Sequence, residues 1–232
     1  MQNILNRSIN LLARSLLSLQ FRKTTRDDLQ KIGSAYGGWV IPTSLLSSSS
    51  ICYCVGVGED ISFDMGLIET FKSPVFAFDP TPRAIRYVQA KAVDVPNYHF
   101  LDVGVWSEDR VMRFYKPKNQ NHVSHSLVNL QNTSDFIEAS FRSLPSLMAE
   151  LGHNRIDLLK LDVEGSEYEI LKHILQEGLQ IEILCIEFDV FTVTQMVTQI
   201  VRASKMLRKL RQGGYAVVNS EGWNYTLVQD NL

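Results

Sequence analysis

The chain has 232 residues, of which 45% are hydrophobic and 21% are charged, and its formal net charge is −2. This composition is typical of a globular protein with a full hydrophobic core, and one main domain is the simplest organisation. A general nucleic-acid-binding protein normally has a basic balance, so the charge argues against a nucleic-acid partner. The three cysteines, Cys52, Cys54 and Cys185, lie in apolar runs, which predicts buried thiols in a reducing, cytoplasmic compartment.

The first 20 residues carry an amphipathic pattern. Its apolar positions recur at helical spacing and are Leu5, Ile9, Leu12, Leu16 and Leu19. Arg14 interrupts this stretch and no small-residue cleavage site follows, so we expect no signal peptide, and no apolar run reaches the ~20 residues that span a bilayer. We predict a helical segment over residues 1–35, docked on a domain over residues 36–232 or on a second subunit of a homodimer. A helix lying on a membrane surface is the alternative.

From residue 51 onward, apolar strand-like runs alternate with helical patterns. Strands are predicted over residues 51–57, 74–79, 98–105, 111–117, 156–163, 181–190, 214–220 and 223–229. Helices are predicted over residues 60–71, 81–92, 144–152, 166–178 and 194–212, and residues 118–140 are expected to be a loop. This order predicts an α/β fold with a doubly wound parallel sheet that ends in an antiparallel pair, and ligands of such sheets bind at the carboxyl ends of the strands.

The turn after the first predicted strand points to an adenosine-containing cofactor. Gly56 and Gly58 let the backbone approach a ligand, and Asp79 ends the next strand, where an acid can accept hydrogen bonds from ribose hydroxyls. NAD is disfavoured because Ile61 stands where a third glycine is wanted and because the acids after Gly58 would repel a pyrophosphate. S-adenosylmethionine carries a positive ammonium group and suits this turn. The alternative is that the glycines only make a tight turn and that Asp79 only caps the next helix.

Several stretches together resemble the FkbM family of S-adenosylmethionine-dependent methyltransferases. They are VGVGEDISFD, VFAFDPTPRAI, RFYKPKNQNHVSHSL, RIDLLKLDVEGSEYEIL and CIEFD, and the likeness runs from about residue 36 to residue 228. The most specific piece is DVEGSE. The resemblance implies a class I methyltransferase, Rossmann-like fold with a seven-stranded sheet whose last strand is antiparallel.

By motif, the resemblance implies contacts to each part of the cofactor. It places Gly56, Gly58 and Glu59 around the methionine portion, Asp79 on the ribose, Asp102, Val103 and Gly104 near the adenine, and Asp162 beside the transferred methyl group. The chain also departs from the family pattern, because Cys54 replaces the aspartate that usually precedes the glycine turn. Glu59 or Asp60 would then replace that acid.

Methyl transfer to an alcohol needs an aligned acceptor and a group that removes its proton. Two groups are candidates: Asp162 with Glu164 after the fourth parallel strand, and His122 with His125 in the loop NQNHVSHS. Helix capping by the acids and ordinary surface positions for the histidines are the alternatives.

Other acids extend this list. We predict that Glu164 and Glu187 contact the substrate. Asp162, Glu164, Glu187 and Asp189 could instead hold Mg²⁺, but spacing alone does not show that they converge, and we predict no metal. Lys160 is expected to pair with a carboxylate.

The sequence therefore predicts an S-adenosylmethionine-dependent methyltransferase that acts on a hydroxyl group of a small molecule or sugar. A nicotinamide-dependent oxidoreductase and a non-catalytic cofactor-binding module are the alternatives.

Overall fold

The computed structural model describes residues 24–92, 94–115, 135–163, 165–188 and 193–230, with side chains from residue 197 onward in the last range. The strands are β1 (Leu29–Ile32), β2 (Trp39–Pro42), β3 (Cys52–Val55), β4 (Val75–Phe78), β5 (Tyr98–Leu101), β6 (Gly104–Val105), β7 (Arg110–Tyr115), β8 (Phe136–Arg142), β9 (Ile156–Leu161), β10 (Ile181–Glu187), β11 (Tyr215–Glu221) and β12 (Asn224–Gln229). The helices are the 3₁₀ helix η1 (Thr43–Leu45) and α2 (Ser62–Phe71), α3 (Pro82–Lys91), α4 (Leu144–Leu151), α5 (Glu167–Glu177) and α6 (Val193–Gln212).

The main sheet has seven strands in the order β11-β12-β10-β9-β3-β4-β5. All neighbouring pairs are parallel except those made by β12, which runs antiparallel to β10 and β11. This confirms the predicted doubly wound sheet with an antiparallel last strand. The strand order reverses between β3 and β9, so the crevice that binds ligands in such folds is expected at their carboxyl ends.

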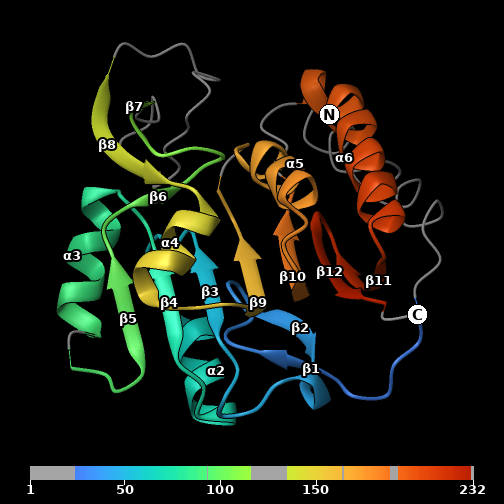
Figure 1. Ribbon diagram of the computed structural model, residues 1–232, viewed down its shortest axis with the longest axis horizontal. Helices are drawn as coiled ribbons and strands as arrows, with labels where there is room; N and C mark the ends of the chain where they lie inside the picture. The colour runs from blue at the N-terminus through green and yellow to red at the C-terminus, as the bar shows by residue number, and fades with distance from the viewer. Residues whose placement is uncertain (1–23, 93, 116–134, 164, 189–192, 231–232) are drawn as a thin grey trace, which may run out of the picture.

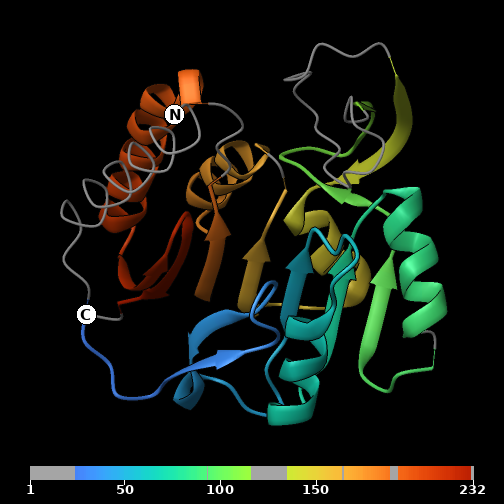
Figure 2. The ribbon, with the colours of Figure 1, turned by 180° about the vertical axis from the view of Figure 1, so that it is seen from behind.

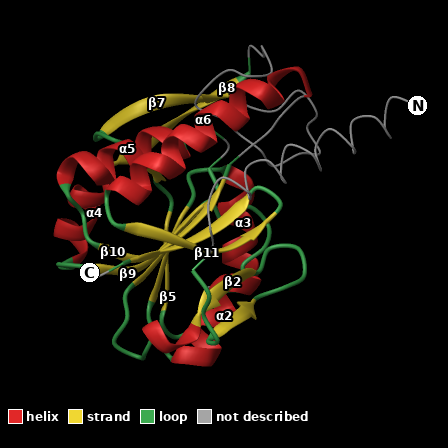
Figure 3. Ribbon diagram, turned by 90° about the vertical axis from the view of Figure 1, so that its right-hand side faces the viewer, coloured by secondary structure: helices red, strands yellow, loops and turns green. Residues whose placement is uncertain are grey.

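Two layers cover the sheet (Figure 3). Helices α4, α5 and α6 pack on one face, whereas α2, α3 and the β1–β2 hairpin pack on the other. Figures 1 and 2 show these two faces in turn. All four residues of β3 and of β4 are buried, as expected for parallel strands that are covered on both sides.

Local signals fix the ends of the helices next to the crevice. Thr81 precedes Pro82 at the start of α3, and its side chain accepts a hydrogen bond from the Ala84 amide. At the start of α2 the capping position is Ile61, and the carboxylate of Asp60 accepts a hydrogen bond from the Ser62 amide at 2.8 Å.

The structure differs from the sequence-based prediction in three places. Residues 29–42 form a hairpin that was not predicted, and the proposed division after residue 35 falls in its turn. Residues 136–140 belong to β8 rather than to a loop, and β8 pairs with β6 and β7 in a second sheet. The run predicted as one strand over residues 98–105 is divided between β5 and β6, which leaves Asp102 outside both strands.

None of the helices in the described part of the chain is both long and apolar enough to cross a membrane. The N-terminal amphipathic segment and the dimer contact predicted for it lie in residues 1–23, outside the described residues.

Candidate active site

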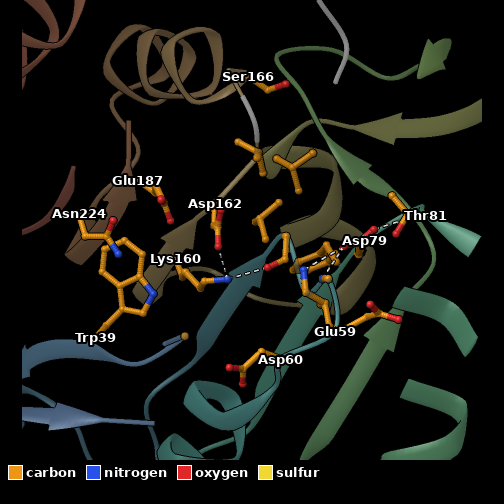
Figure 4. Close-up of a pocket in the computed structure, with 18 of the residues that line it drawn as sticks. Trp39, Glu59, Asp60, Asp79, Thr81, Lys160, Asp162, Ser166, Glu187 and Asn224 are labelled. Carbon is orange, nitrogen blue, oxygen red and sulfur yellow. Dashed lines mark hydrogen bonds and ion pairs between the residues drawn. The ribbon is translucent and has the colours of Figure 1, made fainter. Parts of the chain in front are cut away.

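A pocket of about 760 Å³ opens at the carboxyl ends of β3, β4, β9 and β10. This is where the strand order predicts a ligand site. Figure 4 shows Asp79, Thr81 and Glu59 at one end, and Trp39, Asn224 and Glu187 at the other. Lys160 and Asp162 lie between the two ends.

Gly56 and Gly58 line the pocket, and glycine is needed at the two positions for different reasons. Both have positive φ angles, 84° and 56°, which side chains rarely tolerate. A Cβ atom on Gly56 would overlap the carbonyl oxygen of Asp162, so the end of β9 requires glycine there. A Cβ atom on Gly58 would meet nothing within 4 Å and would occupy open space. Gly58 therefore leaves room for a ligand.

Asp79 lies at the end of β4 and is only 6% exposed. Its Oδ2 atom accepts hydrogen bonds from the amides of Val57 and Gly58, both at 3.0 Å, and its Oδ1 atom accepts one from Thr81 at 2.8 Å. The carboxylate thus holds the glycine turn and the start of α3 together. The sequence predicted a ligand-binding acid or, alternatively, a helix cap. The structure adds that three backbone donors, two of them in the glycine turn, depend on Asp79.

The two acids of the turn already have partners within the protein. Glu59 forms an ion pair with Arg83 of α3 at 2.6 Å. Asp60 accepts hydrogen bonds from the Ser34 hydroxyl at 3.0 Å and from the Ser62 amide. Burial alone would raise the pKa of Asp60, but these hydrogen bonds outweigh it and hold the pKa below its ordinary value. Asp60 therefore places negative charge on the pocket wall, whereas Arg83 balances the charge of Glu59.

Lys160 is the central cation of the site. It is buried, and its Nζ atom donates a hydrogen bond to the carbonyl oxygen of Gly56 at 2.6 Å and lies 3.4 Å from Oδ2 of Asp162. This confirms the carboxylate partner expected for Lys160. Burial would lower the pKa of Lys160, but the charges of Asp162 and Asp64 outweigh burial and raise it. The ammonium group therefore stays charged.

The far end of the pocket is polar and aromatic. Trp39 from β2 and Trp223 next to β12 are almost fully buried, and both line the pocket. Tyr36 in the β1–β2 turn also lines it and is 93% exposed. Glu187 and Asn224 supply the polar groups beside Trp39 (Figure 4).

The sequence predicted Glu187 but not the other residues that line the pocket beside Trp39. The missed residues are Tyr36, Trp39, Glu221, Trp223 and Asn224, and they come from hairpins at opposite ends of the chain. The paired glycines before Trp39 and the glycine before Trp223 were the only local signals of a tight turn.

The remaining predicted site residues fall into two groups. Gly104 lines the pocket, whereas Asp102 is exposed and Val103 packs against the hydrophobic core, so neither of these two is part of the pocket wall. His122, His125 and Glu164 lie outside the described residues, as does Asp189. Within the described ranges, no three His, Cys, Asp or Glu side chains gather in a way that could hold a metal ion.

Comparison with known proteins identifies the family. The family model described as Methyltransferase FkbM domain matches residues 50–217, which is well over half of the chain. The chain therefore belongs to the FkbM methyltransferase family, which sets aside the nicotinamide-dependent oxidoreductase.

Individual relatives are distant. The chain is 24% identical over 176 residues to the human "Probable methyltransferase-like protein 24", a match that covers 72% of this chain but only 42% of the relative. Among solved structures, Methanococcus jannaschii fibrillarin is similar with a TM-score of 0.46 and 14% identity, over 80% of this chain and 69% of that one. Aeropyrum pernix fibrillarin with bound S-adenosyl-L-methionine is similar with a TM-score of 0.43 and 9% identity, over 79% and 66% of the two chains.

The cofactor is S-adenosylmethionine, and the pocket fits it. The open space at Gly58 gives the backbone close access to a ligand, and the volume is within the usual range for cofactor sites. The charged residues that line the pocket also suit a sulfonium, since six are acids (Glu59, Asp60, Asp79, Asp162, Glu187 and Glu221) and two are lysines (Lys31 and Lys160). Gly56, Gly58 and Asp79 are the residues that would hold it.

Proposed function

We propose that this methyltransferase transfers the methyl group to a hydroxyl oxygen of a small molecule or sugar. The observation that carries the proposal is the division of the pocket by Asp162. On one side lies the glycine turn, and on the other lie Trp39, Glu187 and Asn224. An aromatic residue beside a carboxylate and an amide group suits a polar, uncharged acceptor such as an alcohol or a sugar.

The roles follow from these positions. S-adenosylmethionine supplies an activated methyl group when it is bound. Asp162 is 37% exposed at the pocket wall, so its carboxylate can accept a hydrogen bond from an acceptor hydroxyl and orient it. A proton acceptor of this kind contributes about 10²–10⁴-fold to a rate. Glu187 and Asn224 would hold further polar groups of the acceptor.

His122 and His125 are proposed as a second source of a base. In the sequence these histidines lie between β7 and β8 of the second sheet. Phe114 of β7 and Phe141 of β8 line the pocket, so this sheet is part of the site. We place the reaction in the cytoplasm because all three cysteines are free and buried.

The proposal is tested by a screen with radiolabelled S-adenosylmethionine against a panel of alcohols and sugars. Turnover and S-adenosylhomocysteine affinity are then measured for variants of the site. With an acceptor in hand and donor at saturation, Asp162→Asn should lower turnover at least tenfold while S-adenosylhomocysteine affinity stays within about threefold. The exposed acid Asp94 provides the control, and Asp94→Asn should behave as the parent protein. A folded Asp162→Asn protein with full turnover would remove Asp162 from the mechanism and favour the histidines.

A further inference from the structure

Lys160 links the two chain segments on which the cofactor site is built. Through the hydrogen bond to the Gly56 carbonyl it contacts the glycine turn after β3, and through the ion pair with Asp162 it contacts the end of β9. The Asp162 amide also donates to the Val55 carbonyl at 3.1 Å. The ammonium group therefore lies at the point where the strand order reverses, and it lines the pocket itself.

The surroundings of Lys160 keep its charge in this place. Its neighbours in the sheet register are Cys54 on β3 and Cys185 on β10, and both thiols are buried. Asp64 on α2 is buried and interacts electrostatically with Lys160, as Asp60 does from the turn before α2. A buried lysine without such partners would favour its neutral form.

We propose that Lys160 is a positioning and specificity residue that sets how strongly the pocket distinguishes the positively charged donor S-adenosylmethionine from its neutral product S-adenosylhomocysteine. It does so by occupying the Asp162 carboxylate. While the ion pair is intact, Lys160 balances the charge of Asp162 through its Oδ2 atom and fixes the carboxylate relative to Gly56, and the other carboxylate oxygen can still accept a hydrogen bond.

The consequence of removing the lysine charge differs between the two ligands. Without Lys160, the Asp162 carboxylate is an uncompensated negative charge on the pocket wall, and it attracts a sulfonium but not a thioether. Loss of the hydrogen bond to Gly56 loosens the turn and weakens both ligands alike. A merely structural lysine would therefore change both affinities by the same factor, whereas the proposed role changes their ratio.

The experiment is calorimetric titration of the full chain with each ligand in the absence of an acceptor. The quantity of interest is the affinity for S-adenosylmethionine divided by the affinity for S-adenosylhomocysteine. In Lys160→Met this ratio should rise at least fivefold above the parent value, even if both affinities fall by a common factor. Lys160→Arg keeps the charge and should return the ratio to within about twofold of the parent. Lys172, an exposed lysine paired with Glu169 on α5, provides the control, and Lys172→Met should leave the ratio unchanged.

Asp162→Asn should change the affinity ratio in the opposite direction. It also tests the proposal independently if Lys160→Met does not fold. It leaves the Lys160 charge unbalanced, so the same ratio should fall at least fivefold. An unchanged ratio in either folded variant overturns the proposal. The inference rests only on the cofactor, so an acceptor other than an alcohol would contradict the proposed function without affecting this result.

Discussion

Gly56 and Gly58 lie two residues apart, yet the structure predicts different outcomes when each is changed to alanine. Gly56→Ala brings a Cβ atom into the Asp162 carbonyl oxygen at a positive φ angle. Overpacking and left-handed strain together should lower the free energy of unfolding by at least about 3 kcal/mol. Gly58→Ala has open space around its Cβ atom and should lose only about 1–2 kcal/mol from backbone strain.

The same pair should separate stability from binding. Because Gly58 lines the pocket and its Cβ would occupy open space, Gly58→Ala should remain folded but bind S-adenosylhomocysteine at least tenfold more weakly. Urea unfolding measures the first quantity and calorimetry the second. Equal loss of stability in the two variants would mean that β9 does not approach Gly56 as closely as the structure shows.

Asp79→Ala is expected to affect both the fold and the cofactor. Two of its three donors, Val57 and Thr81, are buried, and leaving such amides unsatisfied should lower the free energy of unfolding by about 2–3 kcal/mol. Binding of S-adenosylhomocysteine should weaken by about 1.5–3 kcal/mol, the scale of losing hydrogen bonds to a charged group. Asp94→Ala is the matched control, since Asp94 is exposed. A destabilised variant with full affinity would assign Asp79 to the turn alone.

Among the secondary-structure elements, the β1–β2 hairpin contributes a wall of the pocket through its turn. The Ser34 hydroxyl donates to Asp60 at 3.0 Å and accepts hydrogen bonds from the amides of Tyr36 and Gly37, at 3.2 and 2.9 Å. Ser34→Ala removes all three hydrogen bonds. We expect amide hydrogen exchange at residues 36–37 to accelerate and S-adenosylhomocysteine affinity to fall about two- to fivefold, with a loss of stability of only about 1 kcal/mol.

Ser48→Ala, at an exposed loop serine, is the control for this variant. If exchange at residues 36–37 in Ser34→Ala matches that of the parent protein, the serine does not hold the turn, and the hairpin must be anchored by its packing alone.

The elements that could be predicted from the sequence are those whose pattern does not depend on a distant partner. β3 and β9 are nearly continuous apolar runs because the sheet is covered on both faces. β8 alternates between exposed Phe136 and buried Phe141 and becomes recognisable only when paired with β7. β1 is four residues long and has a single buried position, Ile32. Its sequence therefore shows no alternation of apolar and polar residues that would predict a strand.

At the scale of the whole molecule, some residues of the candidate site could be predicted from the sequence and others could not. The glycine turn, Asp79 and the Lys160–Asp162 pair could be predicted because each lies at the end of a predicted strand. Trp39 and Asn224 could not, since 184 intervening residues separate them in the chain. A hydrogen bond from the Thr226 hydroxyl to the Val40 carbonyl at 2.7 Å joins their two hairpins, and this tertiary contact leaves no local pattern in the sequence.

Cofactor binding should raise the free energy of unfolding of the whole chain, because the pocket is built from elements at both ends of the sequence. A ligand that binds only the folded state at 100 times its dissociation constant adds about 2.7 kcal/mol to the free energy of unfolding. For a domain of this size the midpoint of thermal unfolding should rise by about 5–10 °C with S-adenosylhomocysteine. NAD at the same concentration should give no shift, because the acids that line the pocket disfavour a pyrophosphate. Scanning calorimetry with each ligand checks this, and an equal shift with NAD would contradict the charge argument for the pocket.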